Sequence, residues 1–201
     1  MTPFIENATE GNMDNPLTPE EKKLLLGVAR SALELGVRGE KQTALKLDDM
    51  PERLREVGAS FITLTIHGDL RGCIGALEPY QPLVVDVQEH AVAAALDDPR
   101  FPPVAPKELD KIEIEISRLT LPKKLAYSGA EDLLTKLHPK VDGVTLRDGL
   151  RRATFLPQVW EKIPEKADFL DNLCAKMGAA TDTWRRKPLQ VEIYQVEEFR
   201  E

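Results

Sequence analysis

Two stretches of this chain show the pattern of a β-hairpin followed by a helix and a strand, and this repeated order constrains the fold most. The first stretch covers 61–118 and the second covers 142–196. An offset of 80 residues aligns the two predicted turns and places Cys73 on Ala153. We therefore predict a two-lobed α+β fold, a duplication of a β-β-α-β unit with a mainly antiparallel sheet and helices packed on it.

The domain organisation follows from this repeat. We predict a flexible N-terminal tail and a single domain made of two α+β lobes, with the N-terminal helix packing on them. The predicted ranges are 1–16 for the tail, 17–201 for the domain, and about 58–120 and 140–199 for the lobes.

Local signals place the first helix and one strand. Thr18 offers a capping hydroxyl, proline follows at the first helical position, and Glu21 stands three residues after the cap, so a helix should begin there. Gly36 is the predicted end of this helix. Strict alternation in 111–119 indicates a strand with isoleucines facing inward and glutamates outward.

Charge and composition exclude several classes of protein. The net charge of −7 disfavours nucleic-acid binding through bulk charge. Two basic clusters, 147–152 and 185–187, are interpreted as solvated faces. Two cysteines do not form a disulfide scaffold, no apolar run reaches membrane-spanning length, and the N-terminus lacks a signal-peptide pattern. We expect a cytoplasmic protein with free thiols and no membrane partner.

The first hairpin contains the motif LRGCIG, at 70–75, which marks the candidate site. A turn centred on Gly68-Asp69 would pair residues whose numbers sum to 137, so Cys73 would face Leu64 on the more apolar side of the sheet. Glycine is costly in a strand. Gly72 and Gly75 therefore indicate that a bulge, a neighbouring segment or a ligand approaches the backbone here.

Cys73 has two interpretations. It could be a nucleophile, redox centre or carrier of an intermediate, with Arg71 favouring its thiolate and His67 or His90 as possible bases. It could equally be a small buried core residue.

The candidate anion-binding residues are Arg71 and Arg152, because an arginine fork matches phosphate or carboxylate. A turn at 148–149 would place Arg152 on a polar face with Thr145 and Thr154. Both arginines could instead pair with acidic neighbours on the surface.

Three further residues are candidates for ligand contacts. Asp98 and Arg100 bracket a proline and could line a cleft near Cys73, although such a pair more often locks its own loop. Gln158, at a helix start, could contact a base or sugar. The three histidines are far apart and no CxxC or nucleotide-binding motif occurs, so we predict neither a metal site nor a cofactor.

Several motifs, in order and spacing, resemble those of the AMMECR-one domain family, called AmmeMemoRadiSam system protein A in prokaryotes. They are LRGCIG at 70–75, DPRFPPV at 98–104, IEIEIS at 112–117, DGV at 142–144, RATFLPQVWE at 152–161, LCAKMG at 173–178 and Trp184. The resemblance runs from about Leu17 to Phe199; Leu96 replaces a more usual phenylalanine. It implies a two-lobed α+β fold, no established activity, the company of a Memo-like protein and a radical SAM protein, and a role in RNA modification or regulation.

Three functions follow, in order of preference. The first is an accessory or binding module that holds a small anionic ligand, an RNA or a partner in a cleft beside LRGCIG. The second is a modification enzyme that depends on Cys73 and acts with a radical SAM partner. The third is a structural adaptor without a ligand.

Overall fold

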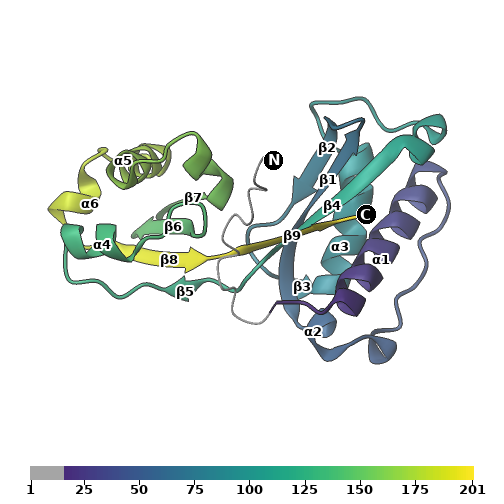
Figure 1. Cartoon of the computed structure of the whole chain (residues 1–201), viewed down its shortest axis with the longest axis horizontal. Helices are drawn as coiled ribbons and strands as arrows, with labels where there is room; N and C mark the ends of the chain where they lie inside the picture. Colours follow the sequence, from purple (N-terminus) through teal and green to yellow (C-terminus); the bar gives the residue numbers. More distant parts are fainter. Residues whose placement is uncertain (1–15) are drawn as a thin grey trace, which may run out of the picture. The chain divides into compact units, whose positions relative to one another are not determined.

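The chain forms two units in the computed structural model, which describes residues 16–201 (Figure 1). The larger unit comprises Leu17–Lys123 and Val196–Glu201, and the smaller unit comprises Lys124–Gln195. The predicted N-terminal tail, apart from its last residue, lies outside the described residues.

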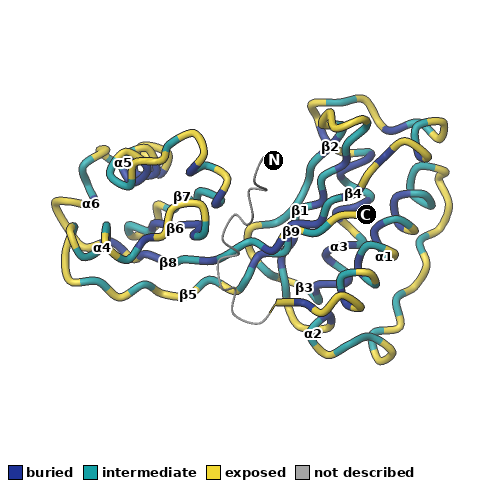
Figure 2. Tube along the Cα trace, viewed as in Figure 1, coloured by how far each residue is buried: buried dark blue, intermediate teal, exposed yellow. Residues whose placement is uncertain are grey.

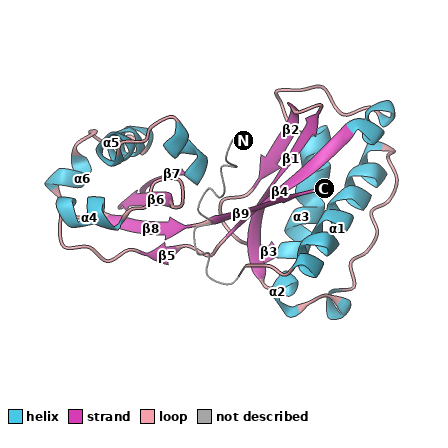
Figure 3. Cartoon of the chain, viewed as in Figure 1, coloured by secondary structure: helices cyan, strands magenta, loops and turns pink. Residues whose placement is uncertain are grey.

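The larger unit contains the first hairpin and the N-terminal helix (Figure 3). Its helices and strands are α1 (Pro19–Val37), α2 (Glu52–Arg55), β1 (Val57–Ile66), β2 (Asp69–Gly75), β3 (Gln81–Pro82), α3 (Leu83–Leu96), β4 (Ile112–Leu119) and β9 (Val196–Arg200), with 3-10 turns at Leu47–Asp49 and Pro106–Lys111.

One antiparallel sheet, in the order β2-β1-β4-β9, carries this unit, and β3 pairs with the start of β1. Helices α1 and α3 cover the same face of the sheet (Figure 1). The predicted alternation of β4 is confirmed, because Ile112, Ile114 and Ile116 are buried in the core beneath these helices (Figure 2). Among the described residues of this unit, no helix covers the opposite face.

The start of α1 is confirmed and its predicted end is wrong. Thr18 Oγ1 accepts a hydrogen bond from Glu21 N at 3.2 Å, and Glu21 Oε2 accepts one from Thr18 N at 2.8 Å, which is a capping box. The helix continues through Gly36 and ends at Val37. Gly39 adopts a φ of +70° and provides the left-handed residue that ends a helix.

The smaller unit contains the second hairpin. Its helices and strands are β5 (Lys123–Lys124), α4 (Ala130–Lys136), β6 (Gly143–Asp148), β7 (Arg151–Phe155), α5 (Lys166–Lys176), α6 (Thr183–Arg186) and β8 (Gln190–Tyr194), with a 3-10 turn at Pro157–Glu161. The sheet order is β5-β8-β6-β7. Its core includes Trp160, which stacks on Phe169 with ring centroids 3.6 Å apart and donates its indole N–H to Asp142 O at 2.7 Å.

The two units repeat one arrangement, a β-β-α-β unit in which the third strand returns beside the first. The orders β2-β1-β4-β9 and β7-β6-β8-β5 correspond strand for strand. The offset that aligns the first strands is 82 rather than 80, because Leu64 and Leu146 occupy equivalent positions. Cys73 therefore corresponds to Thr154 rather than to Ala153.

Candidate functional site

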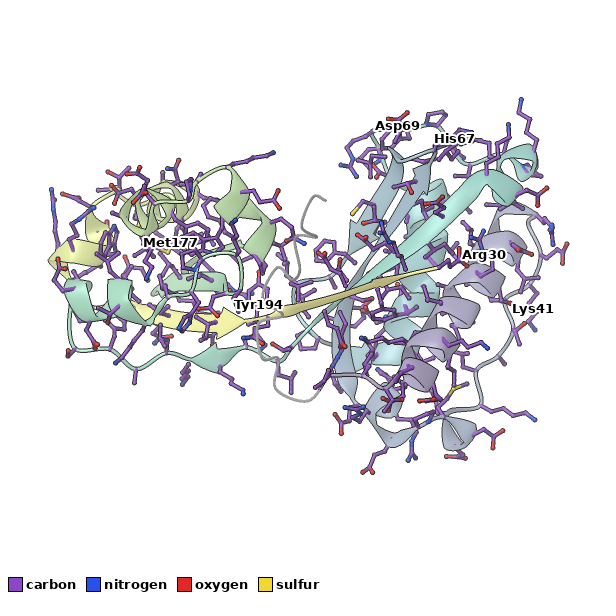
Figure 4. The ribbon with its side chains drawn as sticks, viewed as in Figure 1. Arg30, Lys41, His67, Asp69, Met177 and Tyr194 are labelled. Carbon is purple, nitrogen blue, oxygen red and sulfur yellow. The ribbon has the colours of Figure 1, made fainter. Side chains whose placement is uncertain are left out.

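The first hairpin differs from its predicted register by one residue at Cys73. The two loop residues are His67 and Gly68, with φ values of 54° and 84°, and they pair Ile66 with Asp69 (Figure 4). Two consecutive positive φ values are those of a type I′ turn, and histidine is among the residues that tolerate this region. A shift in register between Leu64 and Thr65 then places Cys73 opposite Thr63.

Cys73 consequently lies on the helix-free face of the sheet, not on its apolar side. Directly opposed residues of antiparallel strands share one face. Cys73 faces Thr63, Thr63 faces Glu115, and Glu115 faces Arg200. We call these four residues, one from each of the four strands, the Cys73 row. The thiol is partly exposed and receives a hydrogen bond from Thr63 Oγ1 at 3.4 Å.

The two glycines of LRGCIG are explained by neighbouring protein atoms. A Cβ built on Gly72 would lie 2.1 Å from the backbone oxygen of Ala94 in α3. One built on Gly75 would lie 2.3 Å from Ser60 O and 2.5 Å from Phe61 Cα. At both positions the neighbouring backbone leaves no room for a side chain. The absence of a Cβ therefore allows α3 and β1 to pack against the motif.

Asp98 and Arg100 hold both backbone polar groups of Cys73, its N–H and its C=O. Cys73 N donates to Asp98 Oδ2 at 2.8 Å, and Arg100 Nη2 donates to Cys73 O at 3.2 Å. Arg100 also donates to both Asp98 oxygens, at 2.9 and 2.6 Å. The pair thus locks the loop that follows α3 onto the free edge of β2. An unpaired edge is otherwise open to another strand.

The electrostatics of this pair are those of a partly buried ion pair. Asp98 is 5% exposed. The hydrogen bond from the Arg100 guanidinium holds the pKa of Asp98 well below its usual range, although burial acts in the opposite direction. Asp98 is therefore a carboxylate at every pH at which the protein is expected to work.

Arg71 is already paired within the larger unit. Its Nε and Nη2 donate to the two carboxylate oxygens of Glu108 at 2.8 and 3.2 Å, and its Nη1 donates to Pro102 O at 3.0 Å. This contact lowers the pKa of Glu108, and the backbone N–H of Ala105 lowers it further. The Arg71 fork thus recognises a carboxylate, as its chemistry predicts, but the carboxylate belongs to the chain.

The acidic group of the row is Glu115. Burial raises the pKa of this carboxyl, the neighbouring Glu198 raises it further, and Arg200 opposes both effects. Glu115 and Thr63 are not among the site residues predicted from the sequence. The alternating pattern of 111–119 did place Glu115 on the outward face, but only the register of three strands shows that it joins Cys73 in one row.

Neither candidate base lies in the Cys73 row. His67 is four strand residues beyond Thr63, which is about 13 Å along β1. His90 is buried beside Asp86, with its Nδ1 3.1 Å from the carboxylate. Asp86 accepts hydrogen bonds from the backbone N and Oγ of Ser60 at 2.8 and 2.6 Å. His90 therefore belongs to the layer between α3 and β1.

The remaining candidates, Arg152 and Gln158, belong to the smaller unit. Arg152 faces Arg147 across the second hairpin, on the face that also carries Thr145 and Thr154, as predicted. The loop of this hairpin is Gly149-Leu150, one residue later than predicted, because Asp148 pairs with Arg151. Gln158 is exposed in the 3-10 turn after β7.

The second cysteine is buried, and the described residues contain neither a cluster that could hold a metal nor a helix that could span a membrane. Cys174 is fully buried in α5, and burial raises the pKa of its thiol. Within 16–201, no three His, Cys, Asp or Glu side chains gather closely enough to hold a metal ion. Over the same range, no helix combines the length and apolar character needed to cross a membrane.

The fold and the site define a class: α+β proteins built from two β-β-α-β units, with a cysteine on the helix-free face of the larger sheet whose backbone is held by an Asp–Arg pair. The chain belongs to the AMMECR1 family, whose family model matches residues 26–199.

Proteins from several archaea are similar over nearly the whole chain. A protein of Methanothermobacter thermautotrophicus is 40% identical over 187 residues, which cover 92% of this chain and 97% of that protein. Protein MK0488 of Methanopyrus kandleri is 36% identical over 94% of this chain and 92% of its own length. The crystal structure of uncharacterized protein PH0010 from Pyrococcus horikoshii is 32% identical and matches with a TM-score of 0.76, over 92% of this chain and 93% of that chain.

Proposed function

We propose that the chain is a binding module whose ligand lies on the helix-free face of the larger unit, against the Cys73 row. The observation that carries this proposal is the double attachment of Cys73, whose N–H and C=O are both held by the Asp98–Arg100 pair. A site of fixed geometry loses less conformational entropy when it binds its ligand. The partly exposed thiol and the Thr63 hydroxyl supply polar contacts on that face.

The charge of this face favours a cationic ligand. Among the paired residues of β4 and β9 on this face, the carboxylates Glu113, Glu115 and Glu198 outnumber one arginine, Arg200. A small anionic ligand at Arg71 would have to displace Glu108, and an RNA would have to approach three carboxylates. A Memo-like or radical SAM partner, as implied by the family resemblance, would present a basic segment here. We therefore propose a positively charged ligand or partner segment.

A modification reaction at Cys73 is the second candidate. The observation that favours it is the hydroxyl of Thr63, 3.4 Å from the sulfur of a partly exposed cysteine. In the smaller unit Thr154 takes the equivalent position, and its hydroxyl contacts Thr145 Oγ1 at 3.0 Å. Because a threonine fills the same place there, the contact also has a purely structural use, and we rank this candidate below the binding module.

A titration with a basic peptide tests the first proposal. We expect an octapeptide of alternating lysine and serine to shift the amide NMR signals of Thr63, Cys73 and Glu115. The variant Glu115→Gln should lower the affinity for the peptide about fivefold, since a charged contact contributes about 1 kcal/mol at a partly exposed site. The matched control is Glu34→Gln, which removes a charge from the exposed end of α1.

Two results would count against the binding module. One is a map of shifted signals that leaves the Cys73 row untouched. The other is an equal loss of affinity in Glu115→Gln and Glu34→Gln, which would indicate attraction by net charge alone.

A further inference from the structure

The two basic clusters of the sequence meet in the smaller unit. A surface pocket of about 330 Å³ lies between the second hairpin, which contributes Asp148 and Arg151, and the α6 segment, which contributes Thr183, Arg186 and Lys187. Another pocket of about 200 Å³ is lined by Arg186 and Lys187 as well. These two residues, which we call the basic ridge, are thus shared by both hollows.

Local backbone geometry brings the clusters together. Gly149, with a φ of +61°, forms the tight turn that precedes Arg151, and Gly178, with a φ of +75°, ends α5. Arg151 Nη1 donates to Gly178 O at 3.0 Å, so the guanidinium is held between the hairpin and the end of the helix. Within residues 16–201, the Arg151 guanidinium forms no ion pair, and its bond to Gly178 O is its one hydrogen bond. Most of its five N–H donors are therefore available.

The charges of the larger pocket are unbalanced. Three cations, Arg151 and the two residues of the basic ridge, share its lining with one carboxylate, Asp148. Lys187 Nζ lies 2.7 and 2.9 Å from the two oxygens of Asp148, and Arg186 pairs with Asp182 at the surface. Such exposed pairs contribute little free energy, so a stronger anion can replace them.

The smaller unit as a whole differs in charge from the rest of the chain. Residues 124–195 contain twelve Lys and Arg against ten Asp and Glu, a net charge of +2, whereas the full chain carries −7. The acidic composition therefore lies outside this unit, and it does not argue against an anion site within it. Both clusters, which the sequence predicts to be solvated faces, therefore belong to a unit with a positive net charge.

We infer that this pocket binds the phosphate groups of a small di- or triphosphate ligand, through Arg151, Arg186 and Lys187. Arginine forks and lysine ammonium groups are the side chains that bind phosphate oxygens most effectively. Two hollows that share the basic ridge suit a ligand that carries more than one phosphate. This site is separate from the Cys73 row and does not depend on the function proposed for it.

The surroundings favour a small ligand over a nucleic acid. Single-stranded nucleic acids bind largely by stacking their bases on exposed aromatic rings. Trp184 is 2% exposed and is covered by the Arg185 guanidinium, 4.1 Å from the ring centroid. The ring of Tyr127 packs against the core of the smaller unit, and its hydroxyl is held by the backbone of Leu189 through contacts at 2.9 and 2.6 Å. Neither aromatic residue that lines the smaller pocket therefore offers a free stacking platform.

Calorimetric titration with inorganic triphosphate tests the inference. At about 0.05 M salt, where surface charges are weakly screened, we expect a Kd below about 1 mM. Arg151→Ala and Lys187→Ala should each weaken binding at least about fivefold, which corresponds to about 1 kcal/mol. Asp148→Asn should strengthen it, because the competing carboxylate is removed.

Two controls accompany these variants. Leu150→Ala removes a fully exposed neighbour of Arg151 without changing the charge, and Arg38→Ala removes an exposed arginine from the larger unit. Both should leave the affinity unchanged. Arg151 and Lys187 are exposed and Asp148 is half-buried, so unchanged thermal midpoints should show that the variants fold.

Three outcomes would overturn the inference. The first is an equal loss of affinity for triphosphate in Arg38→Ala and Arg151→Ala, which would indicate non-specific attraction. The second is weaker binding in Asp148→Asn. The third is tight binding of a ten-nucleotide RNA that triphosphate does not displace, which would assign the pocket to a nucleic acid instead.

Discussion

Replacing Asp98 by alanine should lower the free energy of unfolding by about 3 kcal/mol, because a buried carboxylate that accepts several hydrogen bonds is lost. The backbone N–H of Cys73 loses its acceptor, and Arg100 loses its ion-pair partner. The edge of β2 is then no longer held by the loop after α3. Urea unfolding at pH 7 measures the change, and amide hydrogen exchange at Cys73 should become faster.

The pH dependence of the same group has a definite sign. The pKa of Asp98 is lower in the folded protein than its ordinary value of about 3.9. The ionised Asp98 therefore contributes fully to the free energy of unfolding above about pH 4. This contribution is lost as the pH falls toward the lower pKa of Asp98 in the folded protein. We expect wild-type protein and Asp98→Ala to differ less in stability at pH 2 than at pH 7.

The matched control for Asp98 is its neighbour in the same loop. Asp97 is exposed and follows the last residue of α3. Asp97→Ala makes the same change of charge and size, and it should alter the unfolding free energy by less than about 0.5 kcal/mol. If Asp98→Ala changed the unfolding free energy equally little, the Asp98–Arg100 pair that holds Cys73 would not be a stabilising element.

The second large effect is expected at Gly72. An alanine Cβ there would lie 2.1 Å from the backbone oxygen of Ala94 and would push α3 away from β2. Overpacking of this kind destabilises by about 1–3 kcal/mol, and the backbone contact places Gly72→Ala at the upper end, about 3 kcal/mol. Thermal and urea unfolding of the variant measure it.

Substitution of Gly27 provides a control in which the change in stability has the opposite sign. It lies inside α1, and a Cβ built on it meets nothing within 4 Å. Gly27→Ala should therefore stabilise the protein by up to about 1 kcal/mol, because alanine is the better helix former. Equal effects at Gly72 and Gly27 would contradict the close packing of α3 on the motif.

The sequence predicted correctly those features of the fold that depend on residues close together in the chain. The capping box at Thr18, the alternation of β4 and the polar face of Arg152 follow from neighbouring residues. The duplication was also visible, because hairpin, helix and strand recur in one order.

The site was less predictable, because it depends on contacts between distant residues. The face of Cys73 reverses with a shift of one residue, and the turn at His67 combined with the irregularity after Leu64 decides it. Arg71 meets Glu108 only because the loop after α3 returns to β2. The two basic clusters share a pocket only once α5 and the hairpin have packed.

The accessibility of the two thiols is the most direct test of the face on which Cys73 lies. Cys73 is partly exposed on the helix-free face, and Cys174 is fully buried in α5. With a thiol reagent at pH 7, native protein should label rapidly at one cysteine, and the second should react only after unfolding in urea. Cys73→Ser should abolish the rapid reaction. Two thiols that both stay inert until the protein unfolds, or a rapid reaction that survives Cys73→Ser, would contradict the assignment of Cys73 to an accessible binding face.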